Sequence, residues 1–209
     1  MLSSRISRAA LAAIALLSTA GTASAHHVMG GGVPSTFAQG LLSGLGHPVI
    51  GADHLAFLIA LGIAVGIAGL SLATPIVFLV AMAAGVAAHV AGWSLPASEA
   101  IVALSVLAVG ILLATDRRMP AAGWMALFLI AGFFHGYAFG ESIYGAESTP
   151  LIAYLVGLVA VQSALTIGIA VATRTTWKLS AIAPRLAGAA VGGVGFAALM
   201  AQIIPTPGG

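Results

Sequence analysis

The sequence predicts an all-α polytopic membrane protein: a bundle of six transmembrane helices preceded by a short re-entrant or interfacial segment. Of its 209 residues, 60% are hydrophobic and only 6% are charged, which excludes an ordinary soluble domain. Apolar stretches of about 20 residues, long enough to cross a bilayer, recur with short connections. The chain has no cysteine, so disulfides, thiolate metal sites and cysteine catalysis are excluded.

The N-terminus has the pattern of a secretory signal peptide. Two arginines precede the apolar run Ala9–Leu17, and the small residues Ala23-Ser24-Ala25 follow it. We expect residues 1–25 to be removed by cleavage after Ala25; the alternative is a retained first transmembrane helix. Export of the new N-terminus places the protein in a bacterial inner membrane.

Residues 26–36 are expected to form a flexible periplasmic N-terminus. It begins with His26 and His27, and glycines and a proline follow. Two imidazoles beside a free α-amine could bind nickel or copper loosely, because neutral nitrogen donors suit these ions. The alternative is a tail without a metal-binding role.

Residues 37–209 are expected to form a single transmembrane domain. The apolar stretch from Phe37 to Leu45 is too short to span a bilayer, so we expect an interfacial or re-entrant half-helix leading into His47. Six segments long enough to span follow it: 49–70, 75–93, 98–115, 120–140, 149–172 and 183–204.

Charges in the connections predict the orientation. With the N-terminus outside, the inner connections carry the basic residues of the mature chain, which is the bias of cytoplasmic loops: Arg117, Arg118, Arg174, Lys178 and, just beyond, Arg185. The outer connections carry Glu99, Glu141 and Glu147. We therefore expect both termini in the periplasm.

Many glycines recur at a spacing of four. Small residues at this spacing let helix backbones approach closely inside a membrane. They predict close helix packing, and they also offer faces through which a homo-oligomer could form. The glycines in question are Gly62 and Gly66, Gly132, Gly136 and Gly140, and Gly188 and Gly192.

The densest group of metal-ligand side chains is His47, Asp53 and His54, at the start of the first predicted span. Ionisable residues inside a membrane are costly and mark functional sites. On a continuous helix, seven residues place the two histidines about two turns apart on nearly one face. Pro48 favours a helix that begins at this proline, which would leave His47 just outside it. Asp53 could bind a metal directly or orient a histidine ring.

A second group, His135 and Glu141, lies at the outer end of the fourth predicted span. It repeats the ligand types of the first group, so we expect the first and fourth spans to face each other. A histidine in a membrane span can also be a hydrogen-bonded packing residue, and for His89 this role and a metal-binding role are equally plausible. The polar residues Gln162, Ser163 and Thr166 in the fifth span are expected to form interhelical hydrogen bonds.

At these residues the chain resembles the HupE/UreJ nickel permeases. Members of that family carry H-x5-D-H in the first span, matched by His47, Asp53 and His54, and a pattern near F-H-G-x-A-H-G-x-E in the fourth. The second pattern is matched from Phe134 to Glu141, except that Phe139 stands where its second histidine falls. A histidine that is frequent in the family's fifth span corresponds to Thr166 here.

The resemblance implies transport of Ni²⁺, or of Co²⁺, into the cytoplasm to supply a metalloenzyme such as urease or a hydrogenase. The residues themselves indicate a divalent cation without naming it. The partners expected are this ion and the lipid bilayer. Nothing in the sequence predicts nucleic-acid binding, and without a nucleotide-binding loop we expect no ATP hydrolysis and no resident cofactor.

Two alternatives use the same sequence. The first is an intramembrane zinc-dependent hydrolase, in which the histidines and Asp53 hold a bound Zn²⁺ and Glu141 activates a water. Against it, no serine or second acid stands at a clear helical spacing to the His47 group. The second is a structural subunit of a larger membrane complex, which would leave the polar residues of that group unexplained.

Overall fold

The computed structural model describes residues 32–117, 119–176 and 182–204. The expected signal peptide, His26 and His27 lie outside the described residues. The described chain is all-helical, and its helices are α2 (Phe37–Ile50), α3 (Ala52–Ile67), α4 (Pro75–Val90), α5 (Ser98–Ala114), α6 (Ala121–Glu141), α7 (Ser148–Thr176) and α8 (Ala183–Ile203).

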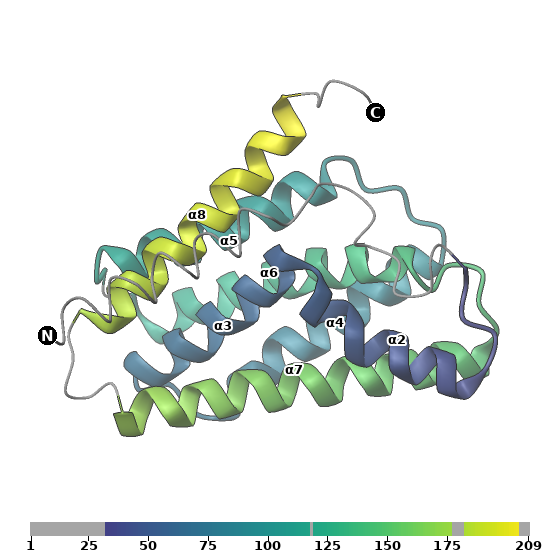
Figure 1. The fold of residues 1–209 in the computed structure, drawn as a ribbon, viewed down its shortest axis with the longest axis horizontal. Coiled ribbons are helices and arrows are strands. Elements are labelled where there is room, and N and C mark those ends of the chain that lie inside the picture. Colours follow the sequence, from purple (N-terminus) through teal and green to yellow (C-terminus); the bar gives the residue numbers. More distant parts are fainter. Residues whose placement is uncertain (1–31, 118, 177–181, 205–209) are drawn as a thin grey trace, which may run out of the picture.

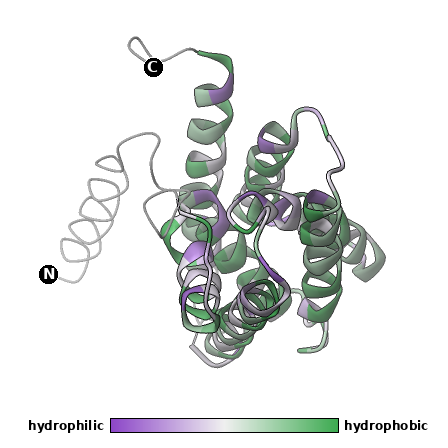
Figure 2. Ribbon diagram, turned by 90° about the vertical axis from the view of Figure 1, so that its right-hand side faces the viewer, coloured by the Kyte–Doolittle hydropathy of each residue, from purple (hydrophilic) through white to green (hydrophobic). Residues whose placement is uncertain are grey.

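The helices are apolar along most of their length, as expected for a membrane protein. In Figure 2 most of the ribbon is coloured hydrophobic, and hydrophilic residues are few. Large apolar side chains such as Val80, Leu129, Ile152 and Phe196 are exposed on the outside of the bundle. Such a surface suits a lipid environment, because lipid tails are as apolar as these side chains and exposing them there carries no hydrophobic cost.

Three helices, α6, α7 and α8, are each long and apolar enough to span a membrane. The pair α2 and α3 passes the same test as one bent span. The apolar helices α4 and α5 have 16 and 17 residues and fall short of the length criterion. Membrane-spanning helices are thus shown, while six spans stay a prediction.

The expected short helix before the first span is present as α2, but it is longer than predicted. The first span was expected to begin at residue 49, with His47 either on one continuous helix with His54 or just outside the helix; instead α2 continues to Ile50 and contains His47 and Pro48, and α3 begins at Ala52. The break comes at Gly51, where the backbone is extended (φ −71°, ψ 108°) and the helix axis bends by 77°. Pro48 thus lies in the last turn of α2, one turn before the break. Because proline has no N–H to donate, it weakens the helix at this point.

Helices pack in three main groups: α4 with α6, α5 with α8, and α7 with both α2 and α3. Figure 1 shows α7 running the length of the molecule beside α2 and α3, and α5 and α8 side by side. The predicted glycines serve this packing. A Cβ at Gly132 or Gly136 would meet the backbone of α4, and one at Gly188 would meet α5.

The contacts also give the relative directions of the helices. Gly62 and Gly66 of α3 meet Thr166 and Thr173 of α7 in the same order, so these helices run parallel. The contacts of α4 with α6 follow the same order and are also parallel, whereas those of α5 with α8 run in opposite order. These directions agree with a chain that crosses alternately.

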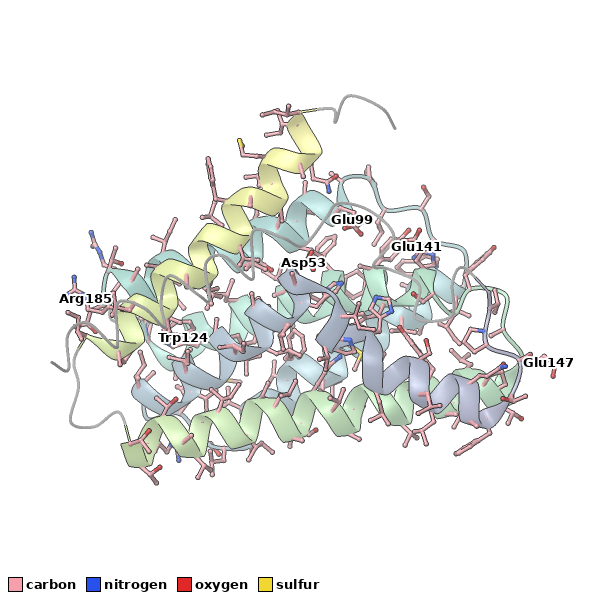
Figure 3. All side chains as sticks on the ribbon, viewed as in Figure 1. Asp53, Glu99, Trp124, Glu141, Glu147 and Arg185 are labelled. Atoms are coloured by element: carbon pink, nitrogen blue, oxygen red, sulfur yellow. The ribbon has the colours of Figure 1, made fainter. Side chains whose placement is uncertain are left out.

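Most charged residues gather by sign, although Asp116 lies beside Arg117 at the basic end. Figure 3 shows Arg185 near one end of the bundle and Glu99, Glu141 and Glu147 toward the other. At the basic end, Arg185 donates to the Ala114 carbonyl at the end of α5 with a distance of 3.1 Å, and Arg174 donates to the Leu70 carbonyl just after α3. Cations stabilise helix C-termini, where carbonyl groups lack partners.

Candidate metal-binding site

Three histidines from three helices meet in the interior. His47 lies near the end of α2, His54 in the first turn of α3 and His135 in α6, and each is at most 3% exposed. The ring centres of His47 and His54 are 5.9 Å apart, and those of His54 and His135 are 4.9 Å apart. We call these three residues the histidine cluster. The expectation that the first and fourth spans face each other is thus confirmed.

The 77° bend explains how His47 and His54 reach the same place. They lie on different helices, and the break at Gly51 turns the start of α3 back toward the end of α2. A Cβ at Gly51 would come 2.7 Å from Cδ2 of His54, so the ring packs directly against the break. Only a residue without a side chain leaves room for it.

His135 is held by a serine that the sequence did not point to. The hydroxyl of Ser105 in α5 donates to the Val102 carbonyl at 2.7 Å and lies 3.0 Å from Nε2 of His135. Because a hydroxyl has one proton to donate, Ser105 accepts from His135 Nε2–H. This places the lone pair of neutral His135 on Nδ1, and Nδ1 of His54 lies 2.8 Å from it.

His47 has a similar support. Its Nδ1 lies 3.0 Å from the hydroxyl oxygen of Ser142 and 3.3 Å from that of Tyr154. Tyr154 donates its proton to the Phe139 carbonyl at 2.8 Å, so toward His47 it can only accept. Hydrogen bonds of this kind fix the tautomer and orientation of metal-binding imidazoles.

Phe139 packs against two members of the cluster. Its ring centre lies 5.1 Å from that of His47 and 4.3 Å from that of His54. The one residue that departs from the second family motif therefore contacts two histidines. An imidazole at this position would join the cluster, and the phenyl ring makes it more apolar.

The carboxylates are placed differently from the histidines. Asp53 is partly exposed in the first turn of α3, where its Oδ1 accepts from the backbone N–H of His54 at 2.8 Å. Glu141 is exposed at the end of α6. In the described part of the chain, no three His, Cys, Asp or Glu side chains are already arranged around a point that could hold a metal ion.

His89 is separate from the cluster and serves aromatic packing. Its ring centre lies 4.6 Å from that of Tyr137 and 5.8 Å from that of Tyr144. Tyr137 in turn donates to the Trp93 carbonyl at 2.6 Å and accepts from Leu95 N–H at 3.1 Å. These contacts fix the connection after α4 against α6.

Our sequence argument against a hydrolase does not hold, because Ser105 and Ser142 contact the histidines from other helices. A helical spacing cannot reveal such contacts. Ser105 nevertheless has the wrong polarity for a nucleophile, since its proton goes to a backbone carbonyl and not to a histidine.

The comparisons with known proteins decide the family. The sequence profile of the HupE / UreJ protein family matches residues 14–198. The chain belongs to the HupE/UreJ family. The chain is also similar to Protein HupE of Rhizobium leguminosarum bv. viciae, with 30% identity over 166 residues, which cover 78% of this chain and 86% of that protein. No solved structure matches.

Family membership gives the histidine cluster its context. Two of its members, His47 and His54, belong to the first motif, and His135 belongs to the second. The two motifs lie more than 80 positions apart in the chain and meet through the contact between His54 and His135.

Proposed function

We propose that the protein transports a divalent transition-metal ion, Ni²⁺ first and Co²⁺ as the second candidate, across the bacterial inner membrane into the cytoplasm. It does so by facilitated or gradient-driven diffusion and without ATP hydrolysis. The ion supplies a metalloenzyme such as urease or a hydrogenase. Membership of the HupE/UreJ family supports this class of function.

One observation carries the proposal: three buried imidazoles from α2, α3 and α6 meet inside an apolar bundle. Burying polar groups in an apolar bundle is costly unless they are hydrogen-bonded, and polar residues kept inside a membrane protein mark functional sites. Neutral imidazole is a good ligand for nickel and cobalt. A lone pair on His135 Nδ1, set by Ser105, points at His54, so an ion that binds here displaces the proton between the two rings.

Few ligands suit a transporter. An ion must bind strongly enough to lose water and weakly enough to leave again. The carboxylates of Glu99, which is partly buried, and of Glu141 and Glu147, which are exposed, lie toward the end of the bundle that we assign to the periplasm, where they would attract cations. Asp53 and Glu141 would lead the ion toward the histidine cluster.

Six spans with both termini in the periplasm complete the proposal. The parallel pairs α3 with α7 and α4 with α6, and the antiparallel pair α5 with α8, are the directions that six alternating crossings require. Arg174 and Arg185 at one end agree with a cytoplasmic face. The shorter α4 and α5 would cross with their flanking residues included.

The test is uptake of radioactive nickel by proteoliposomes that contain the purified protein. We expect uptake above that of empty liposomes, and we expect His54→Ala or Asp53→Ala to abolish it. Uptake by the wild-type protein equal to that of empty liposomes would overturn the proposal. Elemental analysis separates the alternative: a zinc hydrolase requires stoichiometric zinc that survives purification, whereas a transporter holds its ion reversibly.

A further inference from the structure

Gln162 of α7 is fully buried and lacks hydrogen bonds. Its side chain is 0% exposed. Neither Nε2 nor Oε1 has a hydrogen-bond partner among the described residues. A primary amide can donate two hydrogen bonds and accept two, so this side chain leaves its entire capacity unused. Buried polar groups without partners are rare, and a water or an ion is one of the explanations for them. The Nδ1 atom of His89 is also buried without a partner, but Gln162 leaves both of its polar atoms unpaired.

The polar residues of α7 were expected to form hydrogen bonds between helices, and that expectation is wrong for Gln162 and Thr166. Thr166 donates its proton to the Gln162 carbonyl of its own helix at 2.7 Å. Gln162 makes no interhelical bond to any described residue. A hydrogen bond to another helix would offset the cost of burying this amide, but none is present among the described residues, so helix association does not explain the amide.

The place of Gln162 in the fold gives it a role. Helix α2 contacts α7 up to Leu158, through Gly44, and α3 contacts it again from Thr166, through Gly62. As straight helix, the chain from Gly44 to Gly62 would measure about 27 Å, whereas the contacted stretch of α7 measures at most about 22 Å. With the 77° bend, α2 and α3 therefore form an arch over α7.

Gln162 lies on α7 between the two feet of this arch, one turn from Leu158 and one turn from Thr166. The histidine cluster lies at the arch, because His47 is in the last turn of α2 and His54 is in the first turn of α3. Tyr154, which contacts His47, belongs to the same buried stripe of α7 as Gln162 and lies two turns before it. The stripe thus continues from the cluster toward the end of α7 that carries Arg174.

We propose that the Gln162 amide is a second and weaker binding station, which receives a partly hydrated divalent cation from the histidine cluster and passes it toward the C-terminal end of α7. The inference rests on the proposed transport function. The amide oxygen would bind the cation or its water, and the NH₂ group would donate to a second water. An amide has no charge, so it binds more weakly than imidazole and allows release.

The test compares Gln162→Met with Leu158→Met in proteoliposomes. Both variants place methionine in the same buried stripe, but only the first removes an amide, and both keep nearly the volume of the native side chain. We expect Gln162→Met to lower the maximal rate of nickel uptake about tenfold, the effect of one lost hydrogen bond to a charged group. Leu158→Met should transport at nearly the wild-type rate.

Equilibrium binding of nickel to the purified proteins separates transport from binding. We expect Gln162→Met to bind nickel at the histidine cluster as the wild type does, and to unfold at the same temperature or higher, because it removes an unsatisfied polar group. Gln162→Glu, which keeps an oxygen ligand, should transport faster than Gln162→Met.

Two outcomes would overturn the inference. One is wild-type uptake by Gln162→Met. The other is loss of uptake by both Gln162 variants together with a lower unfolding temperature, which would show a packing role only. If the wild-type protein itself moves no nickel, the proposed function fails instead, so the two failures are distinguishable.

Discussion

Two sets of parallel helices, α4 with α6 and α7 with α2 and α3, use the same glycine contacts with different results. Along α4 and α6, glycines meet the opposite backbone over the full length of the contact, from Gly132 beside Phe78 to Gly140 beside His89. Along α7, glycines of α2 and α3 do so only in two separate places. Between these places the chain bends at Gly51 and carries His47, Asp53 and His54.

This difference indicates where a binding site can form in an apolar helix bundle. Continuous glycine contacts bring two backbones so close that no large side chain fits between them. An interruption in the same contact leaves room for side chains, and at the arch these are polar. The histidine cluster thus occupies the one interrupted glycine contact among the described helix pairs that run parallel.

The largest effect is expected when a histidine of the cluster is removed. His54→Ala or His135→Ala should lower nickel uptake by at least about 100-fold, because each removes one of a few nitrogen ligands, worth roughly 3 kcal/mol. His89→Ala is the control, since His89 packs on Tyr137 outside the cluster, and it should stay within about twofold of wild type. Equal losses in His89→Ala and His54→Ala would contradict the assignment of the cluster.

The continuous pair is tested by filling its glycine contact. Gly136→Val places a side chain against the carbonyl of Met82, so it should cost at least about 3 kcal/mol and reduce the yield of folded protein. The measurement is the monodisperse fraction in size-exclusion chromatography in detergent. Gly193→Ala in α8 is the control: nothing lies within 4 Å of the added Cβ, so folding should be retained. Normal folding of Gly136→Val would show that α4 and α6 are not so closely packed.

Ser105→Ala tests the support of the cluster. It removes the acceptor of His135 Nε2–H, which lies 3.0 Å away, and frees the ring to change tautomer. Loss of such a supporting contact typically weakens metal affinity by about 10- to 100-fold. Isothermal titration calorimetry measures the dissociation constant for nickel. An unchanged dissociation constant would mean that Ser105 serves only its own helix, through its hydrogen bond to the Val102 carbonyl.

Phe139→His tests the cluster in the opposite direction, by adding a nitrogen ligand instead of removing one. The phenyl ring packs against both His47 and His54, so an imidazole there should tighten nickel binding by about tenfold, or about 1.4 kcal/mol. Tighter binding should also slow release, so the maximal uptake rate should fall while uptake at low nickel rises. Weaker binding by this variant would show that position 139 does not face the bound ion.

Much of the site could be predicted from the sequence because its ligand types are rare in an apolar chain. His47, His54 and His135 stand out among residues that cannot bind a metal, and the expected contact between two distant spans is confirmed. The supporting residues could not be found this way. Ser105 and Tyr154 are ordinary helix residues and Ser142 follows the end of α6, and their spacing to the histidines along the chain carries no signal.

The sequence by itself determined the helical membrane class, the family and the histidines, since composition, hydrophobic length and motif spacing are properties of the chain alone. Only the tertiary structure decided where the first helix breaks. Pro48 and Gly51 both weaken a helix, and local preference pointed to a start at the proline. Packing of α2 and α3 at separate places on α7 decided for Gly51, and that break turns two histidines toward the third.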